Sequence, residues 1–163
     1  MSSSDRRKFL SLLLTLPIVG CGFSPAYGPG SPAKALLGKV RADDPGSRDA
    51  FTLVARLEER LGLPKDPVYR LAYSISTYRV DLAVTTGGSI LRYETVGTVT
   101  WQLINIATGQ TVTSGTAQSF TGSAATEATI AAQAAEDDAR LRLMQILADQ
   151  IVTKLIATAP KQP

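Results

Sequence analysis

The chain has 163 residues, with 17 lysines and arginines against 14 acidic residues, one cysteine and no histidine. This length fits one compact domain better than two. The lack of histidine excludes Ser-His-Asp and Cys-His nucleophile systems and histidine-ligated zinc, and it removes the commonest general base. We therefore predict a protein that is not an enzyme, with no catalytic residues, no metal and no cofactor.

Residues 1–20 have the composition of an export signal. The basic run Arg6-Arg7-Lys8 precedes the apolar stretch Phe9–Val19, which is about half the roughly 20 residues that a membrane-spanning helix needs. Gly20 before the lone cysteine resembles the bacterial lipobox, in which the thiol takes a diacylglycerol and cleavage exposes the cysteine. We predict that Cys21 is lipidated and starts the mature chain.

The export route stays open between two alternatives. Arg6-Arg7 followed by Phe9-Leu10 resembles a twin-arginine signal, but Asp5 stands where that motif favours Ser or Thr, and paired arginines are common in ordinary signals. Removal of the signal takes away most of the basic excess, and no run of five or six like charges remains. The sequence therefore predicts no nucleic-acid partner.

A segment rich in proline and glycine follows the signal. We assign residues 21–35 to a lipidated N-terminus and linker, which would hold the domain a short distance from the bilayer. Phe23 and Tyr27 interrupt this composition. These aromatic residues are either incidental to the linker or they dock onto the domain, a partner or the membrane. The sequence does not distinguish between these alternatives.

A single domain is predicted over residues 36–159. It begins with a strand over Leu36–Ala42, followed by a turn at Asp43–Gly46. A helix should follow, capped by Ser47 or Asp49 and stopped by the glycine and proline after Leu61. Its charged residues are expected on the outer side, in water: Arg56, Glu58, Glu59 and Arg60.

Three strands are predicted next. Apolar and polar residues alternate over Val68–Val84, and a second strand over Ile90–Ile106 places Val99, Trp101 and Leu103 on one face. Residues 107–110 form a plausible hairpin turn with Gly109 in the left-handed conformation. The return strand runs from about Gln110 to Phe120.

A long helix closes the domain. Its apolar residues follow the helical period and it ends before Pro160, whereas Thr126–Ala135 is helix-permissive without an apolar stripe and leaves the start undefined. One-sided strands and helices in this order predict an α+β fold. We expect a two-layer sandwich, an about four-stranded sheet with two helices packed on one face.

Two acidic runs are the remaining candidates for chemistry. Asp43-Asp44 lies beside a Pro-Gly turn, and Glu136-Asp137-Asp138 lies within the predicted last helix. Adjacent carboxylates point in different directions and do not converge on one site. These runs are interpreted as a solvated turn and a solvated helix face rather than as acid–base or Ca²⁺ sites.

Three features of the sequence point to one known family: the order of elements, the run Cys-Gly-Phe-x-Pro-x-Tyr-Gly at Cys21–Gly28, and the terminal helix Ala139–Leu155. Together they resemble the LPS-assembly lipoprotein family LptE of Gram-negative bacteria. The resemblance implies an outer-membrane lipoprotein that carries out no reaction. Such a protein plugs the LptD β-barrel, helps it to assemble and supports delivery of lipopolysaccharide to the outer leaflet. Gly22 after the cysteine, rather than Asp, permits transfer to the outer membrane.

One feature of the sequence fits a plug. From Gly97 to Ala135 the only charged residue is Glu127, while Thr, Ser, Gln and Asn are abundant. Hydroxyls and amides can bond to the polar interior of a large barrel without the cost of burying charge. The plainer alternative is a threonine-rich hairpin and a loose loop.

Lipopolysaccharide is a second candidate partner. Its phosphates need cations, and Arg70, Arg79 and Arg92 lie on or near the predicted strands. They are the candidate lipopolysaccharide contacts, against the alternative of solvated strand arginines.

Three other functions remain open. The first is an auxiliary lipoprotein of a transporter that moves phospholipids between membranes. The second is a periplasmic enzyme or cofactor protein that uses the twin-arginine route after folding in the cytoplasm, for which the sequence offers no evident ligand set. The third is a structural lipoprotein without a transport role.

Overall fold

The computed structural model describes residues 32–84, 90–124 and 129–158. The predicted signal, Cys21, Phe23 and Tyr27 lie outside these residues. The helices and strands that it contains are, in chain order, α2 (Pro32–Leu36), β1 (Val40–Ala42), α3 (Arg48–Leu61), β2 (Tyr69–Val84), β3 (Ile90–Asn105), β4 (Thr111–Ala124) and α4 (Thr129–Thr158).

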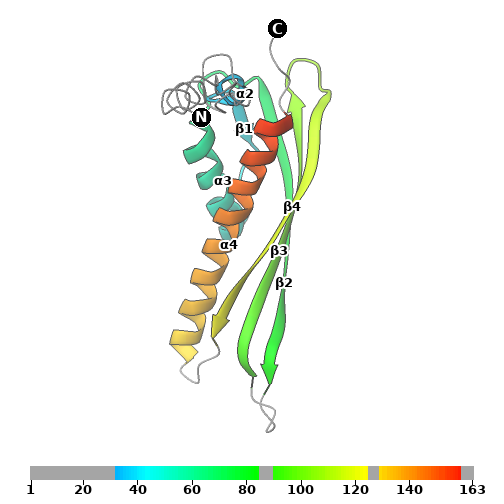
Figure 1. The fold of residues 1–163 in the computed structure, drawn as a ribbon. Helices are drawn as coiled ribbons and strands as arrows, with labels where there is room; N and C mark the ends of the chain where they lie inside the picture. Colours follow the sequence, from blue (N-terminus) through cyan, green and yellow to red (C-terminus); the bar gives the residue numbers. More distant parts are fainter. Residues whose placement is uncertain (1–31, 85–89, 125–128, 159–163) are drawn as a thin grey trace, which may run out of the picture.

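The strands form one mixed sheet in the order β1-β2-β3-β4. The short β1 pairs in parallel with the start of β2, and β2, β3 and β4 follow one another as antiparallel neighbours. The helices lie in a second layer on one side of the long, twisted sheet (Figure 1). The two-layer α+β sandwich predicted from the sequence is confirmed.

Local sequence explains where α3 begins and ends. The Ser47 hydroxyl accepts a hydrogen bond from the Ala50 backbone N–H at 3.2 Å, which satisfies one of the free donors of the first turn. Gly62 follows the helix with a φ of 80° and donates its N–H to the Glu58 carbonyl at 2.8 Å. Glycine suits this position because it has no Cβ to clash at positive φ.

The predicted hairpin turn between β3 and β4 is also present. Gly109 has a φ of 69°, as expected for the left-handed position. The Asn105 side chain accepts hydrogen bonds from the backbone N–H groups of Ala107 and Thr108 at 2.9 and 3.1 Å. These bonds fix the turn and with it the register of the two strands.

The ends of three elements differ from the predictions. The first strand was predicted over Leu36–Ala42, but β1 covers only Val40–Ala42. Leu36 instead ends the short helix α2, in which Ala33 and Leu36 are both buried against the rest of the domain. β4 continues to Ala124, where it pairs with Arg92 of β3. Its last residues are small and polar and carry no alternation that could have predicted the longer strand. The start of α4, undefined in sequence, lies at Thr129.

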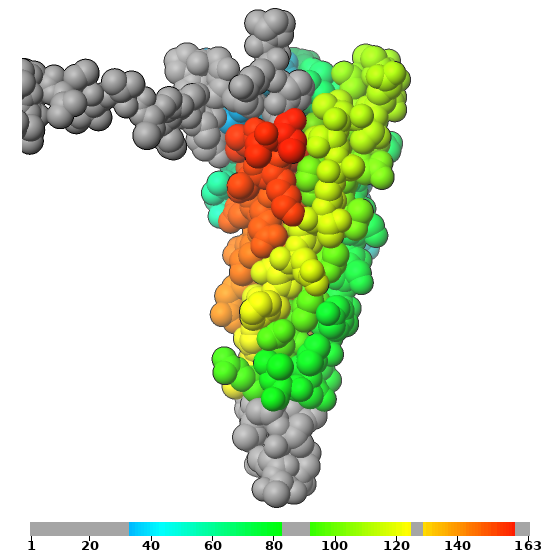
Figure 2. Space-filling view, turned by 45° about the vertical axis from the view of Figure 1, so that its right-hand side comes forward, coloured from blue at the N-terminus to red at the C-terminus, as the bar shows by residue number. Residues whose placement is uncertain are grey.

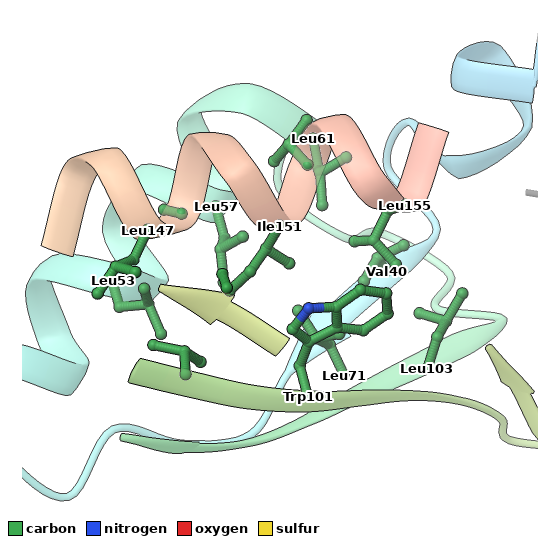
Figure 3. Packing of buried hydrophobic residues seen from close by; sticks show 14 of the residues in the cluster. Val40, Leu53, Leu57, Leu61, Leu71, Trp101, Leu103, Leu147, Ile151 and Leu155 are labelled. Atoms are coloured by element: carbon green, nitrogen blue, oxygen red, sulfur yellow. The ribbon is translucent and has the colours of Figure 1, made fainter. Parts of the chain in front are cut away.

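One hydrophobic core joins the two layers. Trp101 extends from β3 toward α4, where it lies near Ile151 and Leu155 (Figure 3). Leu71 and Leu103 supply the same face of the sheet, and all five side chains are at most 1% exposed. Within the described residues, no helix is both long and apolar enough to cross a membrane.

Arg56 corrects one expectation about α3. Its guanidinium does not simply face water but donates to both carboxylate oxygens of Asp149 on α4, at 3.1 and 2.9 Å, and to Glu59 at 2.8 Å. The bonds to Asp149 are the main reason why the pKa of Arg56 is raised above its usual value. A two-pronged pair of this kind fixes geometry as well as charge, so it orients α3 on α4.

The environment of the Tyr73 phenol predicts that the folded protein loses stability at alkaline pH. Burial, with Asp43 and Asp44 nearby, raises the pKa of its phenol, which donates to the Asp43 carbonyl at 3.2 Å. The folded chain thus holds this proton more tightly than the unfolded chain does, so stability falls as pH rises above about 10. Urea unfolding at about pH 8 and about pH 10.5 should show a smaller loss for Tyr73→Phe than for the wild type. An equal loss in both proteins would contradict this role.

Candidate partner-binding surface

The two faces of the sheet have different environments. Odd-numbered residues of β2, β3 and β4, such as Leu71, Val99 and Ala117, belong to the core beneath the helices. Even-numbered residues point to the opposite side, because successive side chains of a strand alternate between its faces. The described helices all contribute to the core side, so the even-numbered face carries no helix of the described chain.

This face, called the free face below, is uncharged over most of its length. The strand register arranges its middle part in three rows across β2, β3 and β4. The rows are Ala72–Gln102–Ser114, Ser74–Thr100–Thr116 and Ser76–Thr98–Gln118. Their side chains are exposed or half-buried. Apart from Ala72, these residues carry hydroxyls or amides, so the rows form a polar surface without a charged group that would lose its hydration when the surface is covered.

An apolar row borders the polar rows. Tyr78, Val96 and Phe120 lie side by side in the register of β2, β3 and β4. The outer two are 56% and 62% exposed, whereas Val96 between them is only 8% exposed. Two large aromatic side chains left in water in one cross-strand row mark an interaction surface more often than single exposed apolar residues do.

The strand β4 forms one edge of the sheet. Thr111–Ala124 contains no charged residue and no proline, which are the usual devices that keep an edge strand from pairing with another chain. It lies on the surface beside α4 (Figure 2). The Nζ of Lys154 on α4 donates to the Thr116 carbonyl, and the buried Thr121 hydroxyl donates to the Ala139 carbonyl at 2.8 Å. These contacts hold α4 along β4.

The three candidate arginines do not form one cluster. Arg70 pairs in register with Ile104 near the β3–β4 turn and is 3.4 Å from an oxygen of Asp43. Arg79 lies farther along β2 on the core side, 3.6 Å from Glu136, and its guanidinium lies 4.5 Å from the centre of the Tyr93 ring.

Arg92 lies on the free face of β3, opposite Ala124. It forms no ion pair with any residue in the described part of the chain, so its charge is the most accessible of the three. Contact between these arginines and lipopolysaccharide stays a prediction.

The acidic runs are engaged in ion pairs. Asp43 pairs with Arg70, Glu136 with Arg140 and Arg79, and Asp137 with Arg48 at 3.0 Å. A hollow of about 380 Å³ lies where the first turn of α3 meets α4 and is lined largely by these paired charges. No group of three or more acidic or cysteine side chains in the described residues could hold a metal ion. The hollow therefore offers structural ion pairs and no recognisable chemistry.

Sequence reasoning found only part of the free face. It drew attention to the uncharged stretch from Gly97 onward, but it did not include Ser74 and Ser76, which continue the same surface on β2. It also included Thr121, which is buried beneath α4. The missed signal was the small polar residues at alternate positions of β2, which only the register joins to those of β3 and β4.

Solved structures share this fold at low sequence identity. A protein from Caulobacter crescentus CB15 superposes with a TM-score of 0.63 and 20% identity, over 79% of this chain and 96% of that one. The minor lipoprotein from Acinetobacter baumannii superposes with a TM-score of 0.60 and 22% sequence identity, over 77% of this chain and 97% of that one. The rare lipoprotein B from Shewanella oneidensis superposes with a TM-score of 0.56 and 14% sequence identity, over 74% of this chain and 93% of that one.

Sequence comparison gives two results. No curated protein matches the chain in sequence. The profile of the family LptE, described as lipopolysaccharide-assembly, matches residues 39–155. This match spans β1 to nearly the end of α4, and with it the whole sheet and most of the core. The chain therefore belongs to the LptE lipopolysaccharide-assembly family, as its sequence had suggested.

Proposed function

We propose that this chain is a non-catalytic outer-membrane lipoprotein, anchored by acyl chains on Cys21 and facing the periplasm. It plugs an LptD-type β-barrel, helps that barrel to assemble and so supports delivery of lipopolysaccharide to the outer leaflet. Membership of the LptE family supports this role. So do the signal-like residues 1–20 and the lipobox-like residues before Cys21.

The observation that carries the proposal is the free face together with the uncharged edge strand β4. A wide barrel has a polar interior wall, and a plug must lie against it without losing the hydration of many charges. The three rows of hydroxyls and amides meet this condition, and each can donate or accept a hydrogen bond. The row Tyr78–Val96–Phe120 adds apolar area to the same contact.

Lipopolysaccharide contact is a finer part of the proposal. Arg92 is the best placed of the three candidates, because its guanidinium is on the free face and forms no ion pair in the described residues. Arg70 and Arg79 would first have to leave Asp43 and Glu136. Such exposed pairs are weak, so phosphate groups can compete for these arginines.

Purification of the full-length acylated protein from outer membranes in mild detergent tests the proposal. We expect a near-stoichiometric barrel protein, identified by mass, to accompany it. The matched Cys21→Ser variant, which lacks the acyl acceptor, should be depleted from the membrane fraction, since loss of both acyl chains leaves no stable anchor. Recovery of the protein alone would contradict the plug role. Recovery with inner-membrane transporter subunits would favour the phospholipid-trafficking alternative.

A further inference from the structure

One end of the elongated domain brings together three segments that are distant in sequence: the residues after α2, the loop from α3 to β2, and the β3–β4 turn. Figure 1 shows α2, the start of β2 and the β3–β4 turn at the same end. Backbone hydrogen bonds join them: Gly38 N–H to the Leu61 carbonyl at 2.7 Å, Val68 N–H to the Lys39 carbonyl at 2.9 Å, and Ile106 N–H to the Val68 carbonyl at 3.0 Å. We call this the α2 end.

The α2 end exposes an apolar side chain from each of these segments. They are Leu37 at 40% exposed, Leu63 at 70%, Val68 at 39% and Ile106 at 50%. Leu63 is the most exposed, and it sits between Gly62 and Pro64 in a loop that follows α3. Grouped apolar residues that stay in water need a partner more than scattered ones do.

Two lysines accompany the apolar side chains. Lys39 follows Leu37 closely in the chain, and Lys65 lies two residues after Leu63. Both are exposed, and within the described ranges neither forms an ion pair with a carboxylate. Asp66 is the nearest opposing charge in sequence. Ile106 lies beside a hollow that Asp43 and Asp44 line together with Arg41 and Arg70. Exposed apolar side chains with two lysines near them in sequence suit the interface of an anionic bilayer, where acyl chains lie beneath negatively charged headgroups.

The short distance along the chain between Cys21 and α2 favours lipid as the partner. Pro32, the first described residue, belongs to α2. Residues 22–31 separate it from Cys21, and even fully extended this stretch could span only about 40 Å. An acylated Cys21 would therefore keep the α2 end within about 40 Å of the bilayer surface.

From these observations we propose that the α2 end docks on the leaflet that holds the acyl chains, in the protein that has not yet joined its barrel. Leu37, Leu63 and Ile106 enter the interface while Lys39 and Lys65 contact anionic headgroups. The inference rests on the proposed acylation of Cys21 but does not require the barrel. Docking would hold the long axis of the free lipoprotein away from the membrane plane, with the free face uncovered for its partner.

Tryptophan quenching by brominated lipids tests the docking. The full-length acylated protein is purified alone and reconstituted into vesicles of phosphatidylethanolamine and phosphatidylglycerol with brominated acyl chains. Leu63→Trp places an indole at the α2 end, and its emission should fall about twofold, because indoles settle at the membrane interface. Trp101 is 1% exposed and contributes the same background to every variant.

Phe51→Trp is the matched control. Phe51 is 66% exposed, nearly as much as Leu63. It lies in α3, ten residues before the last helical residue Leu61, and therefore about 15 Å along the helix axis from the C-terminal end of α3. Its indole should keep its emission. A Lys39→Glu, Lys65→Glu background should weaken the quenching of Leu63→Trp, as should high salt.

The outcomes separate this inference from the proposed function. Equal quenching at the two positions, or none at either, would overturn docking and indicate a domain that hangs from a passive tether. Co-purification of the barrel is measured independently, so the plug role can hold while docking fails. Quenching that does not respond to the charge-reversed lysines would overturn the part assigned to Lys39 and Lys65.

Discussion

Lysines placed on the free face are expected to abolish assembly with the barrel. In the double variant Thr100→Lys, Gln118→Lys, two ammonium groups occupy neighbouring rows of β3 and β4. Burial of an unpaired charge costs several kcal/mol. The yield of the co-purified barrel complex should therefore fall by at least about tenfold. The free protein should unfold within about 0.5 kcal/mol of the wild type, because both positions are exposed.

The matched control places the same charges on the helix layer. Gln133 and Gln145 are exposed residues of α4, a helix whose surface already carries several charged side chains. Gln133→Lys, Gln145→Lys should leave the yield of the complex close to that of the wild type. If both double variants lose the barrel equally, the free face has no special part in assembly. If neither double variant loses the barrel, the barrel binds a surface other than the free face.

Alanine at Gly115 is expected to destabilise the fold through Trp101. A Cβ added at Gly115 would lie 2.8 Å from Cζ2 and 3.1 Å from Cε2 of that indole. The ring is 1% exposed and cannot move aside within the packed core. We expect a loss of about 1–3 kcal/mol in the free energy of unfolding, the usual cost of overpacking, measured by urea denaturation.

The same strand provides the control. Gly122→Ala places a Cβ no closer than 3.7 Å to its neighbours, so it should be neutral or stabilising by up to about 1 kcal/mol. The indole itself can be tested in a double-mutant cycle. Trp101→Phe should make Gly115→Ala less costly, because the smaller ring leaves room for the methyl group. Additive losses in the cycle would show that the strain lies elsewhere.

Part of this fold could be predicted from short stretches of sequence. The alternation over β2 and β3, the helical spacing in α3 and α4, and Gly109 at its turn each express a short-range constraint on the backbone. These features were sufficient to predict the two-layer sandwich. The resemblance to the family rested on the order of elements, the terminal helix and, as its specific part, the residues Cys21–Gly28. The lipobox-like residues before Cys21 are local in the same way, since a processing enzyme reads them in sequence. For this reason the membrane anchor can be proposed without a structure.

Features that depend on residues far apart in the chain had to come from the tertiary structure. Sequence analysis placed Arg56 in water, but its pairing with Asp149 depends on how α3 packs on α4. It also grouped Arg70, Arg79 and Arg92, which the register of β2 and β3 separates. The free face joins Ser74 to Thr100 and Thr116 by the same register.

The sequence by itself thus determined the order and type of the main elements, the nearly uncharged stretch from Gly97 to Ala135, and the expected acyl acceptor. The tertiary structure decided which polar residues share one face, which arginines are already paired, and which apolar side chains meet at the α2 end. The physical reason is that periodicity and turn chemistry act over a few residues. A binding surface, in contrast, is formed by residues from several strands and loops, which lie side by side only in the folded chain.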